Sequence, residues 1–288
     1  MSGLLDGLGE MGLKNLEGMD LYAKPEAKEA EKKQAAGAAA ASVVKETDFL
    51  FDKGFDCPVC GNKIKARTLR SGRARVIRTD TDLRPVYENI EPLKYEPVVC
   101  PKCGYSALAR FFPSLTQVQV KEIQEKISKA FHASIAEQEV YSYEEALYRY
   151  KLCLANAIVK NAKASEKAYI CLKTGWMLRS WQESLAADKT PENEKKCEEL
   201  KAQEAEYLKN AMEGFLTARQ TEDYPMCGMD ETTVEFLLSV LSMEYGNLDT
   251  ASRLISTILT SPSANARMKD KARDVKDMIL AKMKEKNS

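Results

Sequence analysis

Two short stretches decide the fold of this chain: Cys57-Pro58-Val59-Cys60-Gly61 and Cys100-Pro101-Lys102-Cys103-Gly104. Each has two cysteines three positions apart, a proline between them and a glycine directly after the second. This pattern predicts a tight turn, here called a knuckle, that directs both sulfur atoms to one point, and the glycine supplies the positive φ with which the chain leaves it. Two facing knuckles place four thiolates in a tetrahedron, which suits Zn²⁺ best and iron second. We therefore expect one zinc ion per chain, with iron less favoured, bound by Cys57, Cys60, Cys100 and Cys103.

The repetition of the motif makes the metal prediction specific. A single Cys-x-x-Cys also occurs in thioredoxin-like redox sites, whereas two copies with the same proline and glycine are typical of a four-cysteine metal site. The alternative is two unrelated pairs of reduced cysteines. The remaining cysteines are scattered through sequence of helical character and are expected to pack as free thiols: Cys153, Cys171, Cys197 and Cys227.

Charge is balanced over the 288 residues, with 43 Lys and Arg against 43 Asp and Glu, but it is unevenly distributed. Residues 1–56 carry a net charge of −4 and residues 57–104 a net charge of +5, which is mild for a dedicated nucleic-acid-binding domain. The first residues lack the basic start of a signal peptide, and no stretch approaches the roughly 20 apolar residues that cross a bilayer. We expect a soluble protein of the reducing cytoplasm that does not bind membranes.

Residues 49–112 are expected to form a zinc-ribbon-like β module. Strand-like alternation leads into the first knuckle from Phe49 and resumes after it, and Val98-Val99 enters the second knuckle as a short strand. The 39 residues between Cys60 and Cys100 exceed the roughly 15–20 usual in such sites. We therefore interpret residues 63–78 as an inserted hairpin with a turn at Ser71-Gly72.

This inserted segment is the clearest charge feature of the chain. It contains no acidic residue and seven basic ones: Lys63, Lys65, Arg67, Arg70, Arg73, Arg75 and Arg78. On strands most would share one face, as an anion or nucleic-acid contact surface needs, yet no aromatic residue stands among them to stack with bases. The favoured interpretation is a solvated face or one paired internally with the acidic residues that follow, Asp80, Asp82, Glu88 and Glu91. Contact with nucleic acid or with protein is the alternative.

From residue 113 onward the apolar period changes from 2 to 3.6, which predicts a helical domain over residues 113–288. Ser114 with Gln117, and Ser142 with Glu145, match the capping box that opens a helix. They predict helices ending near residues 135 and 161. Further helices are predicted over 165–186, 191–219, 231–245, 249–260 and 264–285, the last one capped by Ser263.

A spacing of small and large residues recurs on these helices. It is found in Ala146–Tyr150–Cys153, in Ala211–Phe215–Ala218 and, with an apolar last member, in Ala251–Ile255–Ile258. Such a stripe lets a neighbouring helix approach closely, as in the second helix of a tetratricopeptide repeat. The copies are not regularly spaced, so we expect a degenerate tetratricopeptide-like array, with a generic helical bundle as the alternative. The fold class expected is thus α+β, a small zinc-ribbon-like module joined to a larger all-α array.

Residues 1–48 are predicted to be a flexible or partly helical segment. The apolar residues of the first twenty fall near helical spacing, but glycines weaken any isolated helix there by about 1 kcal/mol each. Two interpretations remain open. The segment packs on its own domain, which we favour, or it binds a partner.

The order of parts resembles that of a bacterial family without an assigned function, domain-of-unknown-function family 2225. The resemblance runs from about Phe55 to the C-terminal helices. It is carried by both knuckles and by Arg78-Thr79-Asp80-Thr81-Asp82, Tyr87, Pro92, Tyr95 and Gly104-Tyr105. It implies a metal-ribbon segment followed by tetratricopeptide-like helices, and it implies no known reaction.

These observations favour a non-enzymatic scaffold or adaptor in which the zinc ribbon is structural and the helical array binds a protein or peptide partner. His132 is the only histidine, so the chain lacks the residues of a helical di-iron centre and offers no nucleophile–histidine pair for catalysis. One alternative is a rubredoxin-like iron electron carrier. The other is nucleic-acid binding through residues 63–78.

Overall fold

Both knuckles lie at the ends of antiparallel hairpins, as the ribbon prediction requires. In the computed structural model, which describes residues 45–132 and 138–287, β1 (Leu50–Asp56) pairs with β2 (Lys63–Leu69) across the first knuckle. Likewise β5 (Pro97–Val99) pairs with β6 (Ser106–Leu108) across the second. The expected segment 1–48 lies almost entirely outside the described residues, which begin just before a 3₁₀ turn, η3 (Glu46–Phe49).

The hairpin predicted over residues 63–78 is wrong. β2 returns along β1, with Lys63 opposite Asp56 and Leu69 opposite Leu50. The next strand, β3 (Val76–Thr79), pairs with β4 (Pro85–Tyr87) in a separate hairpin. The reason lies in the loop between β3 and β4, because its side chains bind helix α4 (Ala164–Leu185) and hold this hairpin away from β2.

The first helix begins later and ends earlier than predicted. α2 (Gln117–Ile123) continues as one π-helical turn, η5 (Gln124–Ser128). Its N-cap is Thr116 rather than Ser114, because the Thr116 hydroxyl accepts a hydrogen bond from Gln119 N at 3.3 Å and the Gln119 side chain accepts one from Thr116 N at 3.0 Å. Thr116 and Gln119 thus form a complete capping box, two residues later than the expected pair of Ser114 and Gln117.

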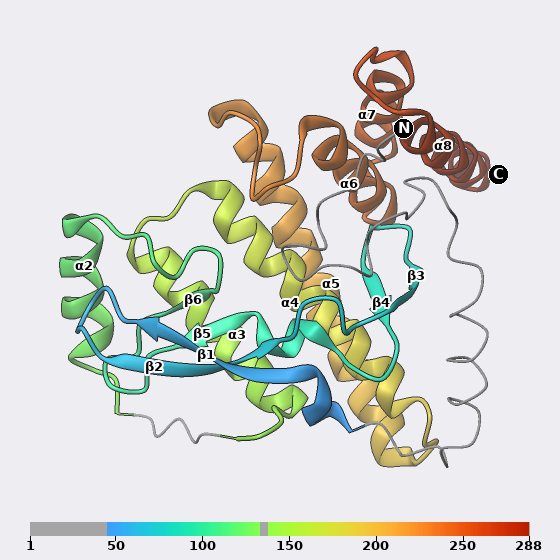
Figure 1. The fold of residues 1–288 in the computed structure, drawn as a ribbon. Helices are drawn as coiled ribbons and strands as arrows, with labels where there is room; N and C mark the ends of the chain where they lie inside the picture. The colour runs from blue at the N-terminus through green and yellow to red at the C-terminus, as the bar shows by residue number, and fades with distance from the viewer. Residues whose placement is uncertain (1–44, 133–137, 288) are drawn as a thin grey trace, which may run out of the picture. The chain divides into compact units, whose positions relative to one another are not determined.

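The remaining helices agree with the predicted ranges to within two residues: α3 (Tyr143–Val159), α4 (Ala164–Leu185), α5 (Pro191–Thr221), α6 (Glu231–Glu244), α7 (Leu248–Thr260) and α8 (Ala266–Asn287). The predicted cap Ser142 accepts a hydrogen bond from Glu145 N at 3.1 Å. Ser263 does not cap α8. Asn265 accepts the hydrogen bond from Met268 N at 2.9 Å instead, and the Ser263 hydroxyl bonds that of Ser261. The fold is therefore α+β, with small strand pairs joined to a helical array (Figure 1).

The three stripes found in the sequence supply the helical core. All nine of their members are buried: Ala146, Tyr150, Cys153, Ala211, Phe215, Ala218, Ala251, Ile255 and Ile258. The long helices α4 and α5 lie side by side (Figure 1), and their cluster also contains Trp176 and Trp181. A second cluster joins α6, α7 and α8. The packing role of the stripes is thus confirmed, while their assignment to a tetratricopeptide-like repeat stays a prediction.

The β module and the helices share one folded unit, Lys45–Ser288. Tyr150 on α3 donates a hydrogen bond to the carbonyl of Leu93 at 2.9 Å. Leu93 lies in a 3₁₀ turn, η4 (Pro92–Tyr95). The boundary expected after residue 112 falls next to Phe112, which is fully buried in the cluster that surrounds the knuckles. Over residues 45–132 and 138–287, no helix has both the length and the apolar character needed to cross a membrane.

Candidate metal centre

Four cysteine sulfur atoms converge between the two hairpins. The Sγ atoms of Cys57, Cys60, Cys100 and Cys103 all lie within 4.8 Å of one another. Cys57 Sγ is 3.6 Å from Cys103 Sγ, and Cys60 Sγ is 3.6 Å from Cys100 Sγ. A tetrahedral site with zinc–sulfur bonds of about 2.3 Å places its sulfur atoms about 3.8 Å apart. The four cysteines therefore fit a single tetrahedral metal ion, as the sequence predicted.

The two knuckles have the same backbone geometry. In the first, Gly61 N donates to Cys57 O at 2.8 Å and Cys57 N donates to Asn62 O at 2.9 Å. In the second, Gly104 N donates to Cys100 O at 3.0 Å and Cys100 N donates to Tyr105 O at 2.8 Å. Both glycines have the predicted positive φ, 70° at Gly61 and 71° at Gly104. The Asn62 side chain lies 3.9 Å from Cys100 Sγ as a weak donor to that sulfur.

The cysteine thiols of the cluster shift one another's pKa values in opposite directions. Hydrogen bonds from the Cys103 and Cys57 thiols hold the pKa of Cys100 far below its ordinary value. The same contact with Cys100 raises the pKa of Cys57 to about 12 and raises that of Cys103 well above the ordinary value. Full deprotonation of such a cluster needs a bound cation, because four thiolates this close repel one another.

Helical side chains donate hydrogen bonds to the backbone of both knuckles. Gln124, just after α2, donates to the carbonyl of Val59 at 3.1 Å, and the fully buried Asn156 of α3 donates to the carbonyl of Gly104 at 3.0 Å. Phe131 packs so closely on Gly104 that a Cβ atom there would lie 2.5 Å from its Cγ. Sequence reasoning missed these supporting residues, because a lone Asn or Gln within a helix carries no local signal of its distant partner.

The seven basic residues of the inserted segment do not form one surface. Lys63, Lys65 and Arg67 share the face of β2 opposite the buried Ile64 and Ala66. The others are dispersed. Arg70 donates to Leu50 O at 2.9 Å, and Arg73 lies exposed. Arg75 lies 3.8 Å from Glu88, and Arg78 pairs with Asp80 and Glu183 at 2.8 and 2.9 Å. Of the four acidic residues expected to pair with this segment, Asp80 and Glu88 do so.

The other two have different partners. Asp82 is buried and accepts from Trp176 Nε1 at 2.9 Å and from Arg179 at 2.9 Å, and Glu91 accepts from Leu93 N at 3.0 Å. The paired, solvated interpretation therefore describes most of the segment. The side chains of Lys63, Lys65 and Arg73 have no hydrogen bond or ion pair with any described residue.

A buried ionic network that the sequence did not predict joins the β3–β4 loop to α4. Arg84, only 1% exposed, donates to Asp80 at 2.6 Å and to the Ser180 hydroxyl at 2.7 Å. Arg179 bonds Glu204 on α5 at 2.7 Å as well as Asp82. Its charges compensate one another, so this network fastens the loop to the helices rather than forming an open site.

Comparison with known proteins supports the resemblance seen in the sequence. A family model described as "Uncharacterized protein conserved in bacteria (DUF2225)" matches residues 50–279. This range includes both knuckles, the ionic network and nearly all of the helical array. Neither the search of curated proteins nor that of solved structures gave a match.

Proposed function

We propose that this chain, which belongs to the bacterial family DUF2225, is a non-enzymatic scaffold or adaptor stabilised by a structural zinc ion. The observation that supports this best is the convergence of four cysteine sulfur atoms, within 4.8 Å of one another, between two hairpins that pack under α2 and α3. The helical array would offer its surface to a protein or peptide partner.

A structural role for the metal follows from the ligand set. Four thiolates complete a tetrahedron and leave no open position, so the ion has no means of activating water or substrate. Cys100 is fully buried and Cys57 is 2% exposed, as expected of a centre that replaces a hydrophobic core. Zinc is favoured over iron because it prefers closed tetrahedral thiolate sites and needs no redox partner. Cysteines that serve as metal ligands rather than as disulfides favour a reducing compartment, which we propose to be the cytoplasm.

The thiols outside the knuckles support a role without catalysis. Burial raises the pKa of Cys171 and of Cys227 to about 11, so both are protonated at neutral pH and are poor nucleophiles. Burial likewise raises the pKa of Cys153 well above its ordinary value. His132 is exposed, and among the described residues no hydrogen bond or ion pair orients it.

The surface proposed for the partner is a groove of about 710 Å³ between α3, α4 and α5. Its apolar contacts come from Leu154, Ile158 and Tyr207, and Ile158 is 61% exposed. Lys151 of α3 and Lys167 of α4 edge it on one side, and Glu206 and Glu213 of α5 edge it on the other. Such a groove suits an amphipathic helix that inserts two or three apolar side chains and carries mixed charges on its flanks.

The test is affinity capture from a bacterial lysate with three full-length, metal-loaded proteins: the wild type, Ile158→Glu and Val118→Glu. Val118 is 71% exposed and lies on α2, outside the groove, so it controls for the added charge. We expect a protein that the wild type and Val118→Glu retain and that Ile158→Glu loses. Equal retention by all three proteins would contradict the groove as the partner site.

A further inference from the structure

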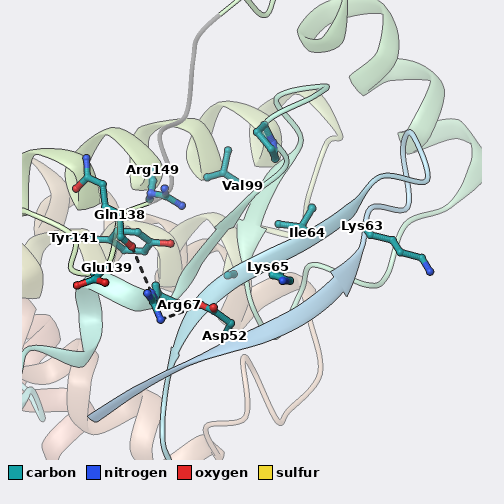
Figure 2. Close-up of a pocket in the computed structure, with 12 residues that line it drawn as sticks. Asp52, Lys63, Ile64, Lys65, Arg67, Val99, Gln138, Glu139, Tyr141 and Arg149 are labelled. Carbon is teal, nitrogen blue, oxygen red and sulfur yellow. Dashed lines mark hydrogen bonds and ion pairs between the residues drawn. The ribbon is translucent and has the colours of Figure 1, made fainter. Parts of the chain in front are cut away.

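A second cavity, separate from the groove and bordered by Pro101 of the second knuckle, lies between β2 and α3 (Figure 2). Its volume is about 320 Å³, at the lower end of the range for small-molecule sites. Ile64, Ala66 and Val99 give it apolar walls, and Tyr141 gives it an aromatic one. The remaining lining is mostly charged. A cavity of this composition can hold a small organic body together with an ionic group.

The most informative lining residue is Arg149. It is only 4% exposed, its Nε donates to Glu145 at 2.7 Å, and its guanidinium carbon lies 4.0 Å from the centre of the Tyr141 ring. These two contacts fix the guanidinium plane, yet its terminal nitrogens make no hydrogen bond to any described residue. A guanidinium that is held in place, with donors left unused beside a cavity, can bind an oxyanion, because its planar fork matches carboxylate and phosphate oxygens.

A second cation reaches the cavity from the strand side. Figure 2 shows Arg67 on β2 bonded to Asp52 and to the carbonyl of Gln138, at 3.1 and 3.4 Å. Its Nη2 has no partner among the described residues. Lys65 also lines the cavity without a partner, whereas Lys63 extends away from it in this view.

The charges around the cavity balance one another once Lys63, which extends away, is left out. The cations are Lys65, Arg67 and Arg149, and the carboxylates are those of Asp52 and Glu139 in the lining and of Glu145, which pairs with Arg149. The case for an anionic ligand therefore depends on the unused hydrogen-bond donors of the two arginines, which such a ligand would complete.

We propose that this cavity binds a small organic molecule through an oxyanion group, a phosphate or a carboxylate, held by Arg149 with Arg67 and Lys65. The apolar and aromatic walls contact the body of the molecule. This site is separate from the proposed partner groove, and it borders the second knuckle through Val99 and Pro101. It also assigns a role to part of the basic segment that pairing within the protein leaves unexplained.

The test is isothermal titration of the full zinc-loaded chain with inorganic phosphate, with phosphoserine and with succinate, each at ionic strength matched by chloride. We expect saturable binding of phosphate compounds or of succinate with a dissociation constant of about 1 mM or tighter. Which probe binds identifies the oxyanion. No saturable binding of any of the three would overturn the proposal.

Variants separate this cavity from a general basic surface. Arg67→Gln and Lys65→Gln alter partly or fully exposed side chains and should leave folding intact. Arg67→Gln should weaken binding by about tenfold or more, because a charge-assisted contact is lost. Arg149→Gln should do the same, and its melting curve shows whether it folds. The control is Arg73→Gln, exposed and outside the cavity, which should change binding less than about twofold. An equal loss in Arg73→Gln and Arg67→Gln would refute the site.

Discussion

The two knuckle glycines allow a matched test of how the helices support the metal centre. Both adopt positive φ, 70° and 71°, so replacing either by alanine should cost about 1–2 kcal/mol of folding free energy through backbone strain. Their surroundings differ. A Cβ atom at Gly61 would meet nothing within 4 Å, whereas one at Gly104 would lie 2.5 Å from Phe131 Cγ.

The difference between the two variants is therefore the cost of moving Phe131. Overpacking of this kind costs about 1–3 kcal/mol, so Gly104→Ala should lose about 2–5 kcal/mol in total and Gly61→Ala only the strain. The measurement is the free energy of unfolding in urea at one fixed free-zinc concentration, because bound metal stabilises the folded state by mass action.

A third variant identifies the source of the difference. Adding Phe131→Ala to Gly104→Ala removes the overlap, so the double mutant should be more stable than the sum of the two single changes predicts. If Gly104→Ala is no less stable than Gly61→Ala, or if the double mutant is simply additive, Phe131 does not press on the second knuckle in the way described.

Two further predictions concern the buried ionic network. Asp82→Ala should lower the free energy of unfolding by about 3–5 kcal/mol, because it leaves the buried Arg179 and Trp176 Nε1 without their acceptor. The control is Asp52→Ala, which breaks a more exposed pair with Arg67 and should cost about 1 kcal/mol or less in the same urea experiment. Similar losses in the two variants would contradict the network's structural role. Burial alone would raise the pKa of Asp80, but the hydrogen bond and charge of Arg84, with two further arginines, lower it below its ordinary value of 3.8. Asp80 therefore stabilises the fold above that value, and its contribution is lost as the pH falls through its lowered pKa. Asp80→Asn should be less stable than the wild type near neutral pH and should show a weaker loss of stability in acid. Parallel curves of unfolding free energy against pH for the two proteins would refute this assignment.

What the sequence could predict was mostly local. A proline, a glycine and two cysteines within five residues specify a knuckle, and the two knuckles converge as expected. The long helices were predictable because their apolar period is sustained and because Ser142 and Thr190 are strong N-caps. The small–large stripes predicted which helix faces are buried, since close helix packing needs those residue types.

What the sequence could not predict depends on contacts between distant residues. The partner of β3 was missed because the β3–β4 loop is held by α4, about a hundred positions away, through Arg84, Ser180 and Glu183. Local alternation makes β2 and residues 73–78 an equally good hairpin, so only the tertiary contacts decide. The supporting role of Asn156 and the cavity beside Arg149 were missed for the same reason, because neither residue belongs to a motif.

Metal content tests the central claim most directly. The protein is purified without added metal or a nickel-binding tag, and its metals are measured by elemental analysis together with a visible spectrum, with Cys60→Ser treated in parallel. The account predicts a colourless protein with one zinc per chain and a variant that retains little metal and is cut by protease within residues 50–112. A wild-type protein without stoichiometric metal, or one that carries iron with thiolate charge-transfer colour, would contradict it.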